Sequence, residues 1–332
     1  MKQTGRPLKQ WLCGGVLALL LMGAVGATSD GTRTTAPVAV VCSAQADSLI
    51  PLGRTVGIKL FSDGVLVVGL AEGEQVPARQ MGLKTGDLIT HINGTEVDTI
   101  EQVQALLADR EAGALTLAVT RGDKQMELRS DTAPGEDGAV RLGAWIRDSM
   151  AGIGTMTFYN PQTDTFGALG HGINDVDTSR LMTMESGSIM HSTVTGVKKG
   201  QSGAPGQLSG SFDVQHDMGR LYANTRAGVY GTLTDESLLG NAQPMEVARR
   251  GQVKKGRATI LSNISGEEVE EYTVEILHVY PAVEGEMRNL MLKVTDPRLL
   301  EQTGGIVQGM SGSPIIQNGK LVGAVTHVCV NQ

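Results

Sequence analysis

Residues 309–314 read Gly309-Met310-Ser311-Gly312-Ser313-Pro314, which has the form G-x-S-G-x-P. Small residues on both sides of Ser311 let the backbone fold tightly and present a hydroxyl group. The N–H groups of Gly309 and Ser311 can then point into one pocket and hold a developing oxyanion. The hexapeptide therefore predicts that Ser311 is a nucleophile, and an ordinary surface turn is the alternative.

A second segment of the same form, residues 200–205, reads GQSGAP and contains Ser202. It follows Lys198-Lys199 and precedes Gly206, so its surroundings indicate a polar hairpin turn. Ser311 instead precedes two apolar runs, 314–316 and 321–325, which can hold a turn rigidly. We therefore expect Ser311, and not Ser202, to be the reactive serine.

A nucleophilic serine needs a general base, and the chain has only six histidines. His171 lies between Gly170 and Gly172, and these small neighbours leave its imidazole open to a cleft. We predict that His171 is the base; a turn histidine bonded to the backbone is the alternative, and His191 is the second candidate. The others are expected in strands or loops, where they pack or face solvent: His91, His216, His278 and His327.

A base of this kind is usually oriented by a carboxylate. Asp296 ends an apolar run at 290–294, precedes Pro297, and lies between His171 and Ser311 in the chain. These grounds favour Asp296 only weakly over the other aspartates as the orienting carboxylate, because an aspartate in a loop by default only faces solvent. The other candidates are Asp164, Asp175, Asp177, Asp213 and Asp217.

The composition favours short strands joined by tight turns. The chain has 332 residues, enough for about two domains, with 44 glycines and only 3% aromatic residues. Many short β-type runs after residue 139 indicate a sandwich or barrel over 139–332. The net charge of −7 gives no electrostatic case for nucleic-acid binding.

The cysteines and histidines show no spacing typical of a metal site. The three cysteines are Cys13, Cys42 and Cys329. A disulfide between Cys42 and Cys329 is one possibility in an oxidising compartment, and two free thiols are the simpler interpretation. We expect neither a metal nor an organic cofactor.

The N-terminus has the layout of an export segment. A basic stretch is followed by an uncharged, largely apolar run from Trp11 to Ala27. Residues 1–27 are therefore expected to be a signal peptide or a membrane anchor, and the pattern does not separate the two. The basic flank predicts that the rest of the chain lies outside the cytoplasm. Residues 28–51 are interpreted as a linker.

Residues 52–131 resemble a PDZ domain of the kind associated with bacterial proteases. The most specific part is 82–94, GLKTGDLITHING, which ends in the tight-turn pair Asn93-Gly94. The resemblance implies that the backbone of Val56, Gly57 and Ile58 receives the carboxylate of a peptide, which adds a strand beside it. A structural β-domain with a closed or unused groove is the alternative.

The C-terminal part of the chain is similar to the stage IV sporulation protein B peptidases of spore-forming bacteria. The similarity rests on 304–328, on 166–172 (FGALGHG) and on 295–297 (TDP). It extends over nearly the whole chain, because the order of a membrane-targeting segment, a PDZ domain and a peptidase domain is also the same. It implies a PDZ domain followed by a chymotrypsin-like double β-barrel serine peptidase. It also implies a catalytic set of His171, Asp296 and Ser311, with the oxyanion held by Gly309 and Ser311. Ser202 matches no catalytic position of that family.

The same resemblance implies a role in sporulation signalling. The enzyme would be exported to the space between the two membranes around the forespore. There it would cleave itself and a membrane-bound regulator, stage IV sporulation protein FA, which triggers intramembrane processing of a pro-sigma factor. Its expected partners are this regulator, peptide C-termini or its own segments at the PDZ groove, and the inner membrane.

Two other functions stay open on the sequence. One is a non-catalytic PDZ adaptor with a degenerate peptidase domain. The other is a general envelope quality-control protease, although that class usually places PDZ domains after the peptidase. Family members continue past the strand ending near Val328, whereas this chain ends at Gln332, so a C-terminal truncation is one interpretation.

Overall fold

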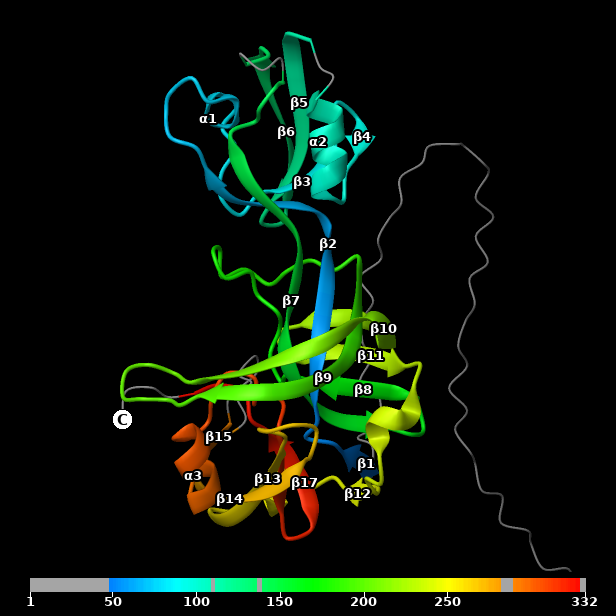
Figure 1. The fold of residues 1–332 in the computed structure, drawn as a ribbon, viewed down its shortest axis with the longest axis vertical. Helices are drawn as coiled ribbons and strands as arrows, with labels where there is room; N and C mark the ends of the chain where they lie inside the picture. Colours follow the sequence, from blue (N-terminus) through cyan, green and yellow to red (C-terminus); the bar gives the residue numbers. More distant parts are fainter. Residues whose placement is uncertain (1–47, 109–110, 136–138, 282–288, 329–332) are drawn as a thin grey trace, which may run out of the picture. The chain divides into compact units, whose positions relative to one another are not determined.

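A computed structural model describes residues 48–108, 111–135, 139–281 and 289–328, and most of them form strands (Figure 1). The predicted export segment, most of the predicted linker and the three cysteines lie outside these residues. Within the described ranges, no helix has the length and apolar character needed to cross a bilayer.

Strands of the first sheet make up the larger part of the fold. This sheet has twelve strands, in the order β12-β1-β7-β8-β11-β10-β9-β2-β3-β5-β6, with β4 paired to β3. The strands are β1 (Ser48–Pro51), β2 (Thr55–Leu70), β3 (Leu88–Ile92), β4 (Thr95–Glu96), β5 (Gly113–Arg121), β6 (Lys124–Thr132), β7 (Ala144–Asn160), β8 (Thr165–Ala168), β9 (Ser186–Lys198), β10 (Gln207–Thr225), β11 (Gly228–Leu233) and β12 (Met245–Glu246).

Six of these strands close a barrel, because β7 pairs with β2 as well as with β8. The ring runs β7-β8-β11-β10-β9-β2 and returns to β7, so none of the six has an open edge along the ring. Alternate residues point inward, as the period of a strand requires. They form one apolar core with residues of β1 and of the turn after β11; its fully buried members include Val56, Met156, Phe166, Ile189 and Val229.

The second sheet has five strands, in the order β15-β14-β13-β16-β17. They are β13 (Gly256–Ser262), β14 (Glu270–Val279), β15 (Leu290–Val294), β16 (Pro314–Gln317) and β17 (Lys320–Ala324). A short helix, α3 (Pro297–Thr303), connects β15 to the loop before Ser311. The core of this sheet also takes Val194 and Leu208 from β9 and β10, which ties it to the barrel.

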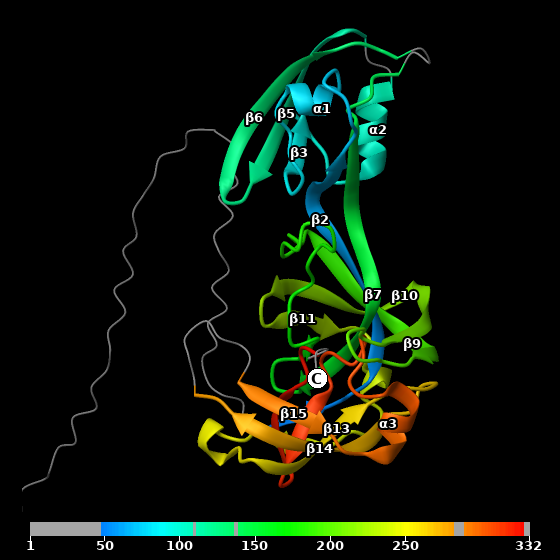
Figure 2. The ribbon, with the colours of Figure 1, turned by 90° about the vertical axis from the view of Figure 1, so that its left-hand side faces the viewer.

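Strands β2 and β7 are long, and their other ends build the PDZ unit. Val65 to Leu70 of β2 pair with β3 on one side and with the first residues of β7 on the other (Figure 2). The remaining elements are β3 to β6, α1 (Pro77–Gln80) and α2 (Ile100–Ala108). Two short 3-10 helices, η1 (Glu236–Leu239) and η2 (Arg250–Gln252), follow the barrel. A separate apolar cluster, which includes Ile89, Leu115 and Val140, forms the PDZ core.

The predicted peptide-binding residues Val56, Gly57 and Ile58 are not in the PDZ unit, which corrects the expectation from sequence. They lie in the barrel half of β2, and both of their edges are already paired, with β7 and with β9. Val56 and Ile58 are buried in the barrel core, and a Cβ on Gly57 would meet the Phe212 ring at 2.8 Å. This backbone cannot accept an added peptide strand.

The domain boundary moves for the same reason. The predicted PDZ domain of residues 52–131 begins too early, since Leu52 packs in the barrel core and Leu60 lies in the barrel half of β2. It also ends too early, because Val140 and Leu142 pack in the PDZ core. Sequence could not show this, because one continuous β run serves two cores.

Candidate active site

The Ser311 turn directly precedes β16 of the five-stranded sheet and is held by short-range hydrogen bonds. The N–H of Met310 donates to the carbonyl of Val307 at 3.1 Å, and that of Ser313 to the carbonyl of Met310 at 3.0 Å. Gly309 and Gly312 have φ angles of +101° and +100°, which side chains with a Cβ rarely adopt. The glycines flanking Ser311 are therefore needed for the shape of the turn.

Thr155 on β7 fastens this turn to the barrel. Its hydroxyl donates to the carbonyl of Gly309 at 2.7 Å, and its N–H donates to the carbonyl of Ser311 at 3.2 Å. Thr155 itself is buried. Sequence reasoning missed this residue, because nothing in its local pattern distinguishes it from other strand threonines.

The N–H groups of Gly309 and Ser311 donate no hydrogen bond to any residue that the structure describes. The neighbouring N–H groups are used, since that of Gly312 donates to the carbonyl of Val325 at 2.7 Å. Two unused donors on either side of Met310 are therefore available for an oxyanion, as the sequence predicted.

His171 and Ser311 come from different sheets and meet the same short segment. The Ser311 hydroxyl donates to the carbonyl of Thr326 at 3.1 Å. The rings of His171 and His327 have their centroids 5.7 Å apart, and a Cβ on Gly170 would lie 2.8 Å from the Thr326 methyl group. The structure therefore brings the predicted base and nucleophile to one site, although no hydrogen bond between them occurs in the described ranges.

The loop that carries His171 is fixed from two directions. Asn224 on β10 accepts from the N–H of Ile173 at 2.9 Å and donates to the carbonyls of Ile173 and Met182. Further along the loop, the buried Asp175 carboxylate forms an ion pair with Arg147 of β7. Burial opposes the charged form of Asp175, but hydrogen bonds from Thr178 and Arg147 outweigh it and lower the pKa. Asn224 had no recognisable signal in the sequence.

The imidazole of His171 has a defined tautomer. Its Nδ1 lies 2.9 Å from the carbonyl oxygen of Gly172. A carbonyl only accepts, so Nδ1 carries the proton and Nε2 of the neutral ring is left as the acceptor. This is the form that a general base needs in order to take a proton from a serine.

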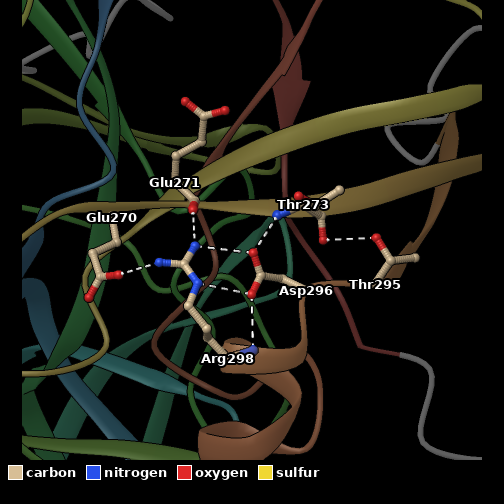
Figure 3. Close-up of polar contacts among 6 residues, drawn as sticks. All are labelled: Glu270, Glu271, Thr273, Thr295, Asp296 and Arg298. Atoms are coloured by element: carbon tan, nitrogen blue, oxygen red, sulfur yellow. Dashed lines mark hydrogen bonds and ion pairs between the residues drawn. The ribbon is translucent and has the colours of Figure 1, made fainter.

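Asp296 lies in a different polar cluster, shown in Figure 3. Its Oδ1 accepts from the N–H and Nε of Arg298 at 3.0 and 3.2 Å, and its Oδ2 accepts from the N–H of Thr273 and Nη2 of Arg298, both at 3.1 Å. The hydrogen bonds from Arg298 are the main reason that the pKa of Asp296 falls to about 2. No hydrogen bond joins Asp296 to His171 in the part of the chain that the structure describes.

The other sequence candidates have local partners. Ser202 lies in a tight hairpin turn between β9 and β10, where Gln201 and Ala204 exchange backbone hydrogen bonds, as its polar context predicted. His191 is in β9, with its Nε2 3.4 Å from Glu267. His216 contacts Asp213 at 2.7 Å on an exposed stretch of β10, not in the polar loop that the sequence suggested.

A cavity of about 960 Å³ opens beside His171. It is lined by Gly172, Arg180, Met182, Arg226 and His327, and by residues of β3 and β5. Among the described residues, no group of three or more metal-ligating side chains is present. The predicted base, His171, is therefore one of the residues that line this cavity.

Comparison with known proteins identifies the family. The model of the SpoIVB peptidase S55 family matches residues 138–332, which is more than half of the chain. The chain belongs to the SpoIVB peptidase family. It is a serine peptidase of sporulation, and the resemblance seen in the sequence is confirmed.

A family model also matches the PDZ unit. A PDZ domain model matches residues 71–121. Among solved structures, the chain is similar to the PDZ domain of the SdrC-like protein from Listeria monocytogenes, with 24% identity over 25% of this chain and 87% of that chain, and a TM-score of 0.23. No curated protein matches. The chain is thus mainly β, with a PDZ domain and a β-rich peptidase domain.

Proposed function

We propose that this member of the SpoIVB peptidase family cleaves peptide bonds through an acyl-enzyme formed on Ser311, with His171 as general base. The observation that carries the proposal is that the Ser311 turn and the His171 loop contact the same Thr326–His327 segment. Thr155 supports it further, because it fastens the nucleophile turn to the barrel that carries His171.

The reaction begins when the Ser311 hydroxyl turns from the carbonyl of Thr326 towards Nε2 of His171. The oxygen attacks the scissile carbonyl carbon while the proton passes to Nε2. The tetrahedral oxyanion is held by the N–H groups of Gly309 and Ser311; losing one such donor typically costs about 2.7–4 kcal/mol of transition-state stabilisation. His171 then gives its proton to the leaving amine, and the C–N bond breaks. Water hydrolyses the acyl-enzyme by the same route.

We further propose the substrates and location that the family suggests. The enzyme cleaves itself and a membrane-bound regulator resembling stage IV sporulation protein FA, and this starts intramembrane processing of a pro-sigma factor. It acts in the intermembrane space around the forespore, to which the basic and apolar N-terminus directs it. Family membership and this N-terminal pattern support the assignment.

The PDZ unit is proposed to bind peptide at a different strand from the one first expected. The first residues of β7, from Ala144 to Arg147, pair with β2 on one edge only among the described residues. Helix α2 lies beside this part of β7, and the N–H of Ile100 donates to the Asp148 carboxylate at 2.9 Å (Figure 2). A strand edge beside a helix is the arrangement by which PDZ domains add a peptide strand.

A fluorophosphonate probe tests the catalytic part, because only an activated serine reacts with it. Wild type and Ser202→Ala are expected to label equally, whereas Ser311→Ala and His171→Ala are not labelled. Wild type incubated with the purified regulator should release a defined fragment that Ser311→Ala does not. Normal labelling of Ser311→Ala, or a folded wild type that never labels, would favour the non-catalytic adaptor.

A further inference from the structure

The carboxylate of Asp296 has no capacity left to orient an imidazole. Two donors bind each of its oxygens, which fills about the four acceptor positions that a carboxylate offers. Its side chain is only 8% exposed, so solvent does not exchange freely with these donors. The hydrogen bonds in Figure 3 therefore fix Asp296 within its own sheet.

Arg298, the main partner of Asp296, is anchored in turn to strand β14. Its Nη1 donates to Glu270 at 2.9 Å, its Nη2 donates to the carbonyl of Glu271 at 2.7 Å, and its guanidinium lies 5.0 Å from the centre of the Tyr272 ring. Asp296 is also the N-cap of α3 and accepts from the N–H of Arg298. The pair consequently clamps the first turn of α3 to β14.

Helix α3 passes this constraint on to the nucleophile turn. Leu299 of α3 is fully buried in the same apolar cluster as Val307 and Met310, the residue before Ser311. At the end of the helix, the single proton of the Thr303 hydroxyl is shared between the carbonyl of Leu299, at 2.7 Å, and the carbonyl of Gly305 in the following loop, at 2.6 Å. A shift of the first turn of α3 would therefore move the loop that presents Ser311.

The group that orients His171 is instead the carbonyl of Gly172, which lies on the same loop. We infer that Asp296 is a positioning residue for Ser311, acting with Arg298 through α3, and that it is not the acid of a catalytic triad. This inference rests on the proposed roles of Ser311 and His171. It reassigns the role that the sequence order of His171, Asp296 and Ser311 had suggested.

Three variants test it: Asp296→Asn, Arg298→Ala and the double variant. Each is assayed for fluorophosphonate labelling per folded molecule, well below its unfolding temperature, and for the pH dependence of labelling. Asp235→Asn is the matched control, because Asp235 is also an N-cap aspartate, of η1, and accepts from the N–H of Ser237 at 2.8 Å.

If Asp296 positions Ser311, the two single variants lose labelling to the same extent, by about fivefold to tenfold, because each removes the side-chain pair between Asp296 and Arg298 while the N-cap of α3 stays in place. The double variant is then no slower than either single variant, because both remove the same clamp. The midpoint of the pH–rate profile stays at its wild-type value, and Asp235→Asn labels at the wild-type rate.

A triad role for Asp296 gives the opposite pattern. Asp296→Asn would then lose activity by about 10⁴-fold, as in enzymes where the acid fixes the histidine tautomer. Arg298→Ala would label almost normally, and the pH–rate profile of Asp296→Asn would move. That outcome overturns the inference and leaves the proposed function intact, whereas normal labelling of His171→Ala would overturn the proposed function itself.

Discussion

Thr155 is joined to Ser311 across the two sheets of the peptidase, since its N–H donates to the Ser311 carbonyl at 3.2 Å. Its hydroxyl adds a second bond, to the carbonyl of Gly309 at 2.7 Å. The base belongs to the barrel and the nucleophile to the five-stranded sheet, so a residue that binds both sides determines how well they are aligned. Alignment within a fraction of an ångström is what catalysis needs.

We expect Thr155→Val to lower the rate of fluorophosphonate labelling while the protein remains folded. Valine keeps the shape of threonine but loses the hydroxyl bond, which is worth about 1 kcal/mol. Because that bond acts on the turn of Ser311, the loss should appear in the labelling rate per folded molecule. Thr157→Val is the control, since Thr157 is also buried on β7. Equal rates for the two variants would contradict the role given to Thr155.

Gly312→Ala should abolish labelling and destabilise the peptidase. A Cβ at this position would lie 2.7 Å from the backbone nitrogen of Leu169 and closer still to the Thr155 carbonyl oxygen, and φ is +100°. Backbone atoms cannot move aside as a flexible side chain can, so the turn must change shape. Thermal unfolding and labelling are the measurements.

Gly319→Ala is the matched control for this change. Gly319 also has a positive φ, of +73°, but a Cβ there would meet nothing within 4 Å. Gly319→Ala should lower the free energy of unfolding only by the cost of placing an alanine in a left-handed backbone conformation, about 1–2 kcal/mol. Labelling should stay unchanged. If both glycine variants behave alike, crowding against the His171 side of the site is not what requires Gly312.

Sequence reasoning found the parts of the site that are encoded locally. The turn around Ser311 and the small neighbours of His171 are properties of a few consecutive residues, and the structure brings both to one site. The polar residues around Ser202 predicted a hairpin turn there, unlike the apolar surroundings of Ser311, and the structure has this hairpin. The mainly β fold followed from turns and short apolar runs, and the family comparison confirms the peptidase and PDZ parts.

The misplaced features depend on long-range pairing. Strand β2 reads as one continuous run, and only its partners show that Val56 belongs to the barrel and Val65 to the PDZ core. Asp296 has a suggestive place in the chain order, but order does not say which side chain a carboxylate meets. Thr155 and Asn224 act through hydrogen bonds to loops that are distant in the sequence, and no local sequence pattern predicts such bonds.

The Asp296–Arg298 pair should make stability depend on pH in the acid range. The hydrogen bonds from Arg298 hold the pKa of Asp296 at about 2, below its ordinary value of 3.8. The contribution of the ionised Asp296 to the free energy of unfolding is therefore fully present above about pH 4, and it is lost as the pH falls through the folded-state pKa. Denaturant unfolding of wild type should show a fall in unfolding free energy over this range that Asp296→Asn lacks. Identical pH dependence in the two proteins would mean that the pair does not stabilise the fold.

Asn224→Ala should release the loop that carries His171. The amide of Asn224 pairs the N–H and carbonyl of Ile173 and the carbonyl of Met182. Alanine leaves the N–H of Ile173 and the carbonyl of Met182 without this partner, while the carbonyl of Ile173 still accepts from the N–H of Met182. Unpaired polar groups that cannot reach water cost about 1–3 kcal/mol each, so the loop is expected to rearrange. We expect slower labelling of Ser311 together with faster hydrogen exchange in residues 171–182.

Two further variants separate the contributions of Asn224. Asn224→Asp keeps the acceptor for the N–H of Ile173 but loses both donors, so its labelling rate should lie between those of wild type and Asn224→Ala. Asn241→Ala, at an exposed position outside this loop, should change neither labelling nor exchange. If Asn224→Ala increases exchange in the loop while labelling stays at the wild-type rate, His171 does not depend on this loop for its alignment.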